Sequence, residues 1–251
     1  TSSLVGSEMC IRDSLLYRGS PTLLDRTIQQ AIVMTIGDLF EDQFSDKSYG
    51  FREGRNCQQA VQRAQKYIED GNRWVVEMDL SKFFDRVNHD ILMDRVSRVI
   101  DDKAILKLIR RYLNAGIMED GLVSPRLEGV PQGSPLSPLL SNIMLTELDR
   151  ELEERGLNHV RYADDCNIYV KSEKAAQRVL TNITKYVEGT LKLRVNRDKS
   201  GTFRPRDSVF LGYTFSKANC TRIIVAQKSV KRLWTKLHKI FNTCLLYTSD
   251  A

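Results

Sequence analysis

Apolar residues recur at the helical period in several stretches of the chain. The first of these helices is predicted to begin at Asn56, whose side chain can cap it, and to stop at Gly71. A long central helix opens at Ser137 with Pro138 at its first helical position, and Gly156 follows its end. The helices predicted in this way are 56–71, 89–100, 104–114, 137–156 and 173–188.

Extended segments lie between these helices. Residues 74–80 (WVVEMDL) are apolar and rich in β-forming residues, which predicts a buried strand. Two short β-like runs, 160–162 and 167–170, flank Ala-Asp-Asp-Cys, so this tetrapeptide is expected at a hairpin tip. A second hairpin is predicted to pair 209–215 with 223–226 across the polar residues 217–219. The order of elements predicts an α+β fold with a sheet backed by helices.

Composition places the chain among ordinary globular proteins. Of its 251 residues, 41% are hydrophobic and 28% are charged, and the formal net charge is +6. Apolar runs are far shorter than the ~20 residues of a membrane span, and the five cysteines show no metal-binding or disulfide pattern. We therefore expect a soluble, cytosolic protein with no membrane partner.

Both ends of the chain differ from the rest. Leu4–Ser14 (LVGSEMCIRDS) reads as the translation of a transposase library adapter, and Cys244–Ala251 (CLLYTSDA) reads as the translation of its inverted copy. The alternative is that both are native termini. We expect 1–14 and 244–251 to be adapter-derived, and natural sequence to continue beyond both ends.

Three carboxylates occupy the ends of predicted strands. Asp79 ends the apolar strand, and Asp164 and Asp165 occupy the hairpin tip. Adjacent carboxylates repel each other by ~1 to 4 kcal/mol at 4 Å, and a divalent cation would supply the missing charge. Mg²⁺ prefers such oxygen ligands, and two ions can support in-line phosphoryl or nucleotidyl transfer. The alternative is a solvated turn with Asp79 as a helix cap.

These acids stand within longer motifs that resemble the reverse transcriptase family, and more closely its bacterial group II intron branch. The similarity runs colinearly from about Pro21 to about Gln227. The motifs that carry it are SYGFREGR (48–55), MDLSKFFD (78–85), RVNHD (86–90), PQGSPLSP (131–138), LSPLLSN (136–142), RYADDCNIYV (161–170) and FLGYTF (210–215).

The resemblance implies a right-hand polymerase fold with fingers and palm. An antiparallel palm sheet backed by helices is expected, with a truncated thumb. The implied division places part of the fingers at 15–73, the palm with its catalytic motifs at 74–227 and the start of the thumb at 228–243.

By motif position, Asp79, Asp164 and Asp165 are the catalytic aspartates that hold two Mg²⁺ ions, for which Mn²⁺ can substitute. Leu80 is implied to offer its backbone carbonyl to one ion. Lys199 matches a lysine that protonates the departing pyrophosphate, which suits the environment-sensitive pKa of lysine. The alternative for Lys199 is a solvent-exposed cap.

Other motif positions are implied to contact the incoming nucleotide. Phe84 matches a residue whose ring excludes a ribose 2′-hydroxyl, with core packing against Phe83 as the alternative. Gln132 and Gly133 match the loop beside the nucleotide, where glycine allows close backbone approach. The two residues before the aspartate pair, Tyr162 and Ala163, are also placed beside the substrate.

A further set is implied to contact nucleic acid. It comprises the hairpin residues Phe210, Leu211, Gly212 and Tyr213, which resemble a primer grip, together with Arg52 and Arg55 of the FREGR string. The chain departs from the family pattern at three positions. Ser134 stands where glycine is usual, Glu53 where proline is usual, and Leu16 where a basic residue contacts the triphosphate.

The function implied is RNA-directed DNA polymerisation in support of group II intron mobility. The implied partners are intron RNA as template, a DNA primer or target, and dNTPs. One alternative is a maturase-type RNA-binding protein that assists intron splicing. Another is a retron, diversity-generating or CRISPR-associated reverse transcriptase.

Overall fold

Helices and antiparallel strands alternate in the computed structural model, which describes residues 22–115, 117–119, 122–124, 128–131, 133–216 and 222–247. The helices of these ranges are α1 (Leu23–Glu41), α2 (Cys57–Glu69), α3 (Phe83–Arg86), α4 (His89–Ser97), α5 (Lys103–Asn114), α6 (Ser137–Glu154), α7 (Glu173–Gly189) and α8 (Gln227–Tyr247). The strands are β1 (Trp74–Met78), β2 (Ile117–Glu119), β3 (Leu122–Ser124), β4 (Asn158–Tyr162), β5 (Asp165–Val170), β6 (Gly201–Phe203), β7 (Tyr213–Phe215) and β8 (Ile223–Val225). The predicted α+β class is confirmed.

Four of the strands form one antiparallel sheet in the order β4-β5-β1-β6. The central strand β1 pairs with β5 so that Met78 lies opposite Cys166. β4 and β5 are the arms of a hairpin in which Tyr162 pairs with Asp165. The residue after β1, Asp79, and the tip of this hairpin therefore lie at the same end of the sheet.

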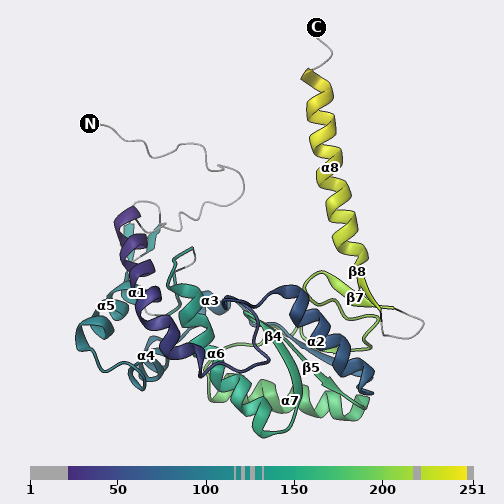
Figure 1. Cartoon of the computed structure of the whole chain (residues 1–251), viewed down its shortest axis with the longest axis horizontal. Coiled ribbons are helices and arrows are strands. Elements are labelled where there is room, and N and C mark those ends of the chain that lie inside the picture. The colour runs from purple at the N-terminus through teal and green to yellow at the C-terminus, as the bar shows by residue number, and fades with distance from the viewer. Residues whose placement is uncertain are drawn as a thin grey trace.

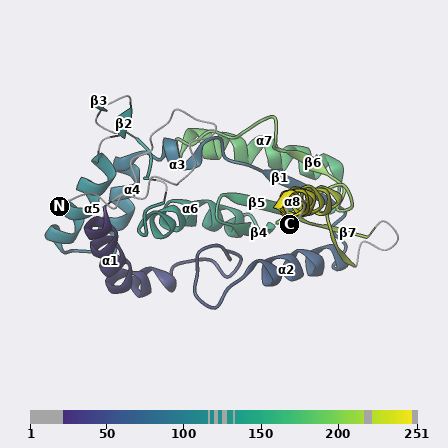
Figure 2. The ribbon, with the colours of Figure 1, turned by 90° about the horizontal axis from the view of Figure 1, so that it is seen from above.

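Different helices cover the two faces of this sheet, as Figure 2 shows for α2 and α7. Side chains alternate along a strand, so Val76 and Ile168 join the core formed with α6 and α7. Their neighbours Val75 and Tyr169 join a second core formed with α2 and the β7–β8 hairpin. This alternation decides which polar side chains share a face at the end of the sheet.

Helix α6 is the buried element between the sheet and the outer helices. Most of its residues from Leu139 to Leu152 are buried, and α1 and α4 pack against it. A helix that is apolar on most of its surface belongs in a protein interior. At one end of the molecule α1, α4 and α5 gather around it, and β7 and β8 lie at the opposite end (Figure 1). Pro138 stands in its first turn, as predicted.

The structure confirms the strands and helices predicted from periodicity, and it adds elements that were not predicted. Asn56 caps α2 by accepting a hydrogen bond from the backbone N–H of Gln59. The predicted hairpin tip between β4 and β5 and the predicted pairing of β7 with β8 are both present. The long helix α1 and the edge strand β6, which pairs with β1, were not predicted.

Helix α8 extends away from the rest of the molecule (Figure 1). It covers the region predicted to begin a thumb and continues as helix to Tyr247. The stretch Leu4–Ser14 and the predicted turn at 217–219 lie outside the described residues. Among the helices that the structure describes, none combines the length and apolar character needed to cross a membrane.

Candidate active site

The strand register brings the three predicted catalytic acids together. Because Met78 lies opposite Cys166, Asp79 is the next position opposite Asp165. Val75 lies four positions before Asp79, and Tyr169 lies four positions after Asp165. Both Val75 and Tyr169 are on the α2 face. Asp79 and Asp165 therefore belong to the same face of the sheet, and Asp164 lies beside them in the hairpin turn.

Crowding of these acids changes their protonation. Partial desolvation raises the pKa of Asp165 to about 6 although the residue is exposed at the surface, and the negative charges of Asp164, Asp79 and Glu77 add to the effect. Burial likewise raises the pKa of Asp164, reinforced by the charge of Asp79. The Lys199 ammonium lowers both pKa values without cancelling the increase. The end of the sheet is therefore a concentration of negative charge within a net-basic chain.

Lys199 lies beside the first aspartate, as its predicted role requires. Its Nζ is 3.9 Å from Oδ2 of Asp79, and its side chain is 70% exposed. It belongs to a turn that begins at Asn196, whose backbone N–H donates to the Asp79 carbonyl at 2.8 Å. The Ser200 hydroxyl accepts from the Asp79 N–H at 3.0 Å. The segment 196–200 therefore holds both the backbone of Asp79 and a mobile cation next to its carboxylate.

The backbone at Leu80 is oriented toward the hairpin side. Leu80 forms an antiparallel bridge with Val195 in which the bonds are made by the flanking residues Asp79 and Ser81. In such a non-hydrogen-bonded pair, the N–H and C=O of the central residue point away from the partner segment. The Leu80 carbonyl consequently faces away from Val195, an orientation compatible with its predicted role as a ligand.

Glu77 is a fourth acid on this face, and the motif comparison did not single it out. It lies two residues before Asp79 in β1, and its Oε1 accepts a hydrogen bond from the Val209 N–H at 3.0 Å. Burial raises the pKa of Glu77, while hydrogen bonds from Ser208 and Val209 oppose that increase. Glu77 thus fastens the segment before the β7 hairpin to the strand that carries Asp79. Its spacing from Asp79 in an alternating strand was a sequence signal that could have identified it.

Phe84 lies at the junction of two predicted motifs. It is half-buried, and its ring meets that of buried Phe83 edge to face, with centroids 5.2 Å apart. Its carbonyl accepts from the Val130 N–H at 2.5 Å. Only glycine fits at position 129, because a Cβ at Gly129 would lie 2.7 Å from the Asp85 carbonyl carbon. The segment before the nucleotide loop is therefore packed directly onto the backbone around Phe84.

The loop predicted to border the nucleotide is described in part. Gln132 lies outside the described residues, and Gly133 is exposed with a φ of 81°. Ser134, which stands where the family usually has glycine, is buried and donates through its hydroxyl to Oε1 of Gln29 in α1. The departure from the family pattern thus adds a contact between the loop and α1.

The predicted primer-grip residues form a tight turn next to the palm sheet. Phe210 and Tyr213 exchange backbone hydrogen bonds of 2.9 Å, and Leu211 and Gly212 between them both have positive φ. Phe210 is buried in the core on the α2 face, whereas the other three are half-buried. Tyr162 is half-buried on the same face, and Ala163 is buried in the hairpin turn.

The two arginines of the FREGR string are engaged within the protein. The Arg52 side chain is 3% exposed, and it pairs with Glu41 and donates to the carbonyls of Ser45 and Ser48. Such a buried guanidinium stabilises its own loop, so the structure does not present Arg52 to a nucleic-acid strand. Arg55 pairs with the exposed Asp46 at 2.8 Å and remains partly accessible.

The donor set fits a hard divalent cation, although the carboxylates do not converge on one point. Across the part of the chain that the structure describes, no three Asp, Glu, His or Cys side chains form a ready-made metal cluster. Asp79, Asp164 and Asp165 supply the oxygen ligands that Mg²⁺ prefers, and their crowding is the feature that a cation would relieve.

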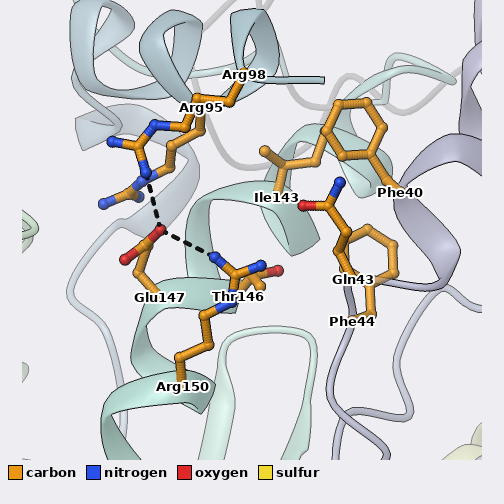
Figure 3. Close-up of a pocket in the computed structure, with 9 residues that line it drawn as sticks. All are labelled: Phe40, Gln43, Phe44, Arg95, Arg98, Ile143, Thr146, Glu147 and Arg150. Carbon is orange, nitrogen blue, oxygen red and sulfur yellow. Dashed lines mark hydrogen bonds and ion pairs between the residues drawn. The ribbon is translucent and has the colours of Figure 1, made fainter. Parts of the chain in front are cut away.

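A separate pocket lies on the other side of α6 (Figure 3). It measures about 30 Å³, and its arginines come from α4 and α6. The Glu147 carboxylate forms ion pairs of 3.5 Å with both Arg98 and Arg150. None of the predicted catalytic residues lines this pocket, and we assign the chemistry to the acids at the end of the sheet.

Comparison with known proteins agrees with this geometry. Residues 16–215 match the family described as reverse transcriptase (RNA-dependent DNA polymerase). Protein YkfC of Escherichia coli (strain K12) is 36% identical over 234 residues, which cover 78% of this chain and 61% of YkfC. The group II intron-encoded protein LtrA of Lactococcus lactis subsp. cremoris is 38% identical over 132 residues, or 53% of this chain and 22% of LtrA. The chain thus spans at most about three fifths of these relatives.

Solved structures give the class of fold. Telomerase from Candida albicans, solved with a fragment of telomeric RNA, superposes with a TM-score of 0.58 at 14% identity, covering 84% of this chain and 39% of telomerase. The antiparallel sheet, its backing helices and the acids at one end define a polymerase fingers-and-palm fold. The chain belongs to the reverse transcriptase (RNA-dependent DNA polymerase) family. The predicted likeness to group II intron-encoded members is confirmed.

The raised pKa of Asp165 predicts a pH-dependent gain in stability when its charge is removed. A carboxyl whose folded pKa exceeds its ordinary value of 3.8 stabilises the fold below about pH 4 and loses that contribution as pH rises through about 6. Asp165→Asn should therefore raise the Tm at pH 7 in chelator. The expected shift is about 2–4 °C, or about 1 kcal/mol after allowance for solvent screening of an exposed side chain.

At pH 4 the same substitution should change the Tm little, because wild-type Asp165 is then largely protonated. Asp101→Asn, at an exposed loop position, provides the matched control and should give no such pH-dependent difference. Thermal unfolding followed by circular dichroism measures both. A lower Tm for Asp165→Asn at pH 7 would contradict the charge crowding.

Proposed function

We propose that this chain carries the polymerase domain of a group II intron reverse transcriptase. It would add dNTPs to the 3′-hydroxyl of a DNA primer on an intron RNA template. The observation that carries the proposal is the placement of Asp79 and Asp165 across neighbouring strands, with Asp164 in the adjoining turn. This arrangement lies within residues 16–215, which match the reverse transcriptase family.

The three aspartates are the proposed ligands of two Mg²⁺ ions, with the Leu80 carbonyl as an additional ligand and Mn²⁺ as a substitute. When bound, such a pair of ions activates the attacking hydroxyl and stabilises the leaving phosphate oxygen. The protein's own part is to hold the carboxylates in register. It does so through the paired strands β1 and β5 and the backbone bonds around Asp79.

The residues next to the acids have proposed roles in nucleotide selection and proton transfer. Phe84 would contact the sugar of the incoming nucleotide, while Gln132 and Gly133 would border it. Lys199 lies 3.9 Å from Asp79 and is exposed, so its ammonium can turn toward a departing pyrophosphate.

Nucleic acid would lie along the same face. The turn formed by Phe210, Leu211, Gly212 and Tyr213 is joined to β1 through Glu77 and Val209, and it would support the primer end beside the acids. Arg55 is the accessible cation of the FREGR string. The net charge of +6 favours phosphate binding with salt-dependent affinity.

The test is primer extension on an RNA template with Mg²⁺ and dNTPs, with sequencing of the product. The proposal expects a DNA product complementary to the template, lost on chelation. The maturase-type alternative expects tight intron RNA binding with no extension even in Mn²⁺. The intact aspartate set favours the polymerase, since RNA binding alone does not require these carboxylates.

Replacing Phe84 should relax sugar selection. Phe84→Ala removes the ring that would meet a 2′-hydroxyl, so we expect the preference for dNTPs over rNTPs to fall by about 10²-fold, within the range that one steric or apolar contact provides. Single-nucleotide incorporation of dCTP and CTP measures the ratio. Ile91→Ala, which shortens a partly buried side chain of α4, controls for general core loss. An unchanged ratio would favour the core-packing alternative for Phe84.

A further inference from the structure

A fully buried arginine lies directly behind the catalytic turn. Arg161, in β4, is 0% exposed, and its Nε and Nη2 bond to the Asp149 carboxylate of α6 at 2.6 to 3.0 Å. Burial alone raises the pKa of Asp149, but the charge and hydrogen bonds of Arg161, with the His159 ring 3.5 Å away, outweigh it and hold that pKa low. Asp149 is thus an ionised anchor for Arg161 inside the protein.

The remaining donor of this guanidinium points at the turn. Nη1 of Arg161 donates to the carbonyl of Ala163 at 2.9 Å and to Oδ1 of Asn142 at 3.0 Å. The amide of Asn142 in turn donates to the Gly50 carbonyl at 2.9 Å. The planar Arg161 guanidinium therefore joins α6 to Ala163, the residue that precedes the two aspartates. Asn142 extends this connection to the loop at Gly50.

The turn needs such support because its backbone is strained. Ala163 has a φ of 56°, in the left-handed region that disfavours residues with a Cβ by about 1–2 kcal/mol. Strained residues persist where the surroundings determine their conformation from several sides. Here the surroundings are the Arg161 guanidinium on one side and the close backbone of Gly50 on the other.

We propose that Arg161 is a positioning residue that fixes the left-handed turn at Ala163, and so fixes where the backbone presents Asp164 and Asp165 to a metal ion shared with Asp79. The proposal rests on the metal-binding role given above to the three aspartates. Arg161 touches neither substrate nor metal in this scheme, and it acts through the Ala163 carbonyl.

Arg161→Lys separates positioning from charge. Lysine keeps a positive charge next to Asp149, but it lacks the planar fork that reaches Asp149, Asn142 and Ala163 together. We expect Mn²⁺ affinity, measured by electron paramagnetic resonance, to fall by about 10–100-fold, the range for loss of an outer-shell partner. Hydrogen exchange of the peptide containing 163–165 should become faster, whereas exchange in α7 should be unchanged.

Arg95→Lys is the matched control. Arg95 also donates to a backbone carbonyl of α6, that of Met144 at 2.8 Å, but on the helix face away from the turn. The Mn²⁺ affinity of Arg95→Lys should equal that of the wild type. If Arg161→Lys does not fold, Asn142→Ala provides the second variant. It leaves the Arg161–Asp149 pair intact and should weaken Mn²⁺ binding in the same direction by a smaller factor.

The outcomes separate this inference from the proposed function. If the wild type binds no Mn²⁺ through the three aspartates, the proposed function fails. If the wild type binds Mn²⁺ and either folded variant binds it equally well, with unchanged exchange at the turn, the positioning role of Arg161 is overturned while the proposed function stands.

Discussion

Asp164→Asn should abolish RNA-templated incorporation of dNTPs while leaving RNA binding unchanged. The substitution keeps the size of the side chain in the turn but removes a charged oxygen from the crowded acids. Metal-ion stabilisation of a transition state amounts to several kcal/mol, and a loss of about 4 kcal/mol corresponds to about 10³-fold in rate. Primer extension measures the rate, and filter binding of labelled RNA measures the affinity.

Asp94→Asn provides the control for this substitution. Asp94 is an exposed acid of α4 that pairs with Arg98 at 2.6 Å, and surface ion pairs of this kind contribute little to stability. The incorporation rate and the RNA affinity of Asp94→Asn should match those of the wild type. Full activity of Asp164→Asn would remove the catalytic role from the aspartate trio and leave the maturase-type function as the better account of the chain.

Gly50→Ala should damage both the fold and the site. A Cβ at Gly50 would lie 2.3 Å from the backbone nitrogen of Ala163 and 3.0 Å from the carbonyl carbon of Tyr162. Because these neighbouring atoms belong to the backbone, no flexible side chain can move aside, and the hairpin tip must shift. Overpacking of this kind destabilises by about 1–3 kcal/mol, which lowers the Tm by about 2–4 °C for each kcal/mol in a chain of this size.

The displaced tip should also lower the incorporation rate more than the loss of stability explains, because it carries both hairpin aspartates. The assay is run well below the Tm of the variant, where it is folded. Gly37→Ala is the control, since its Cβ would meet nothing within 4 Å and alanine favours the helix α1 by about 0.5–1 kcal/mol. A Gly50→Ala variant as stable and active as the wild type would show that the loop does not buttress the turn.

These contacts explain why the site was only partly predictable from the sequence. The three aspartates could be predicted because each stands next to the end of a predicted strand and within a motif. The shared face of Asp79 and Asp165 follows from strand alternation once the register is known. Register depends on long-range pairing between segments nearly ninety residues apart, which local periodicity does not encode.

The supporting residues were harder to find for the same reason. Arg161 and Asp149 are twelve positions apart on different elements, and their burial as a pair becomes visible when α6 packs on β4. Arg52 looked like a surface cation in a basic string, yet tertiary contacts with Glu41 and two carbonyls bury it. Edge strand β6 has three residues, too few for a clear period.

The most direct measurement of the central claim is anomalous X-ray scattering from crystals of the chain grown with Mn²⁺, template-primer and a dNTP. The account predicts two Mn²⁺ peaks among the carboxylates of Asp79, Asp164 and Asp165, one of them within reach of the Leu80 carbonyl. Mn²⁺ bound elsewhere on the chain, with the three aspartates free of metal in the loaded complex, would contradict it.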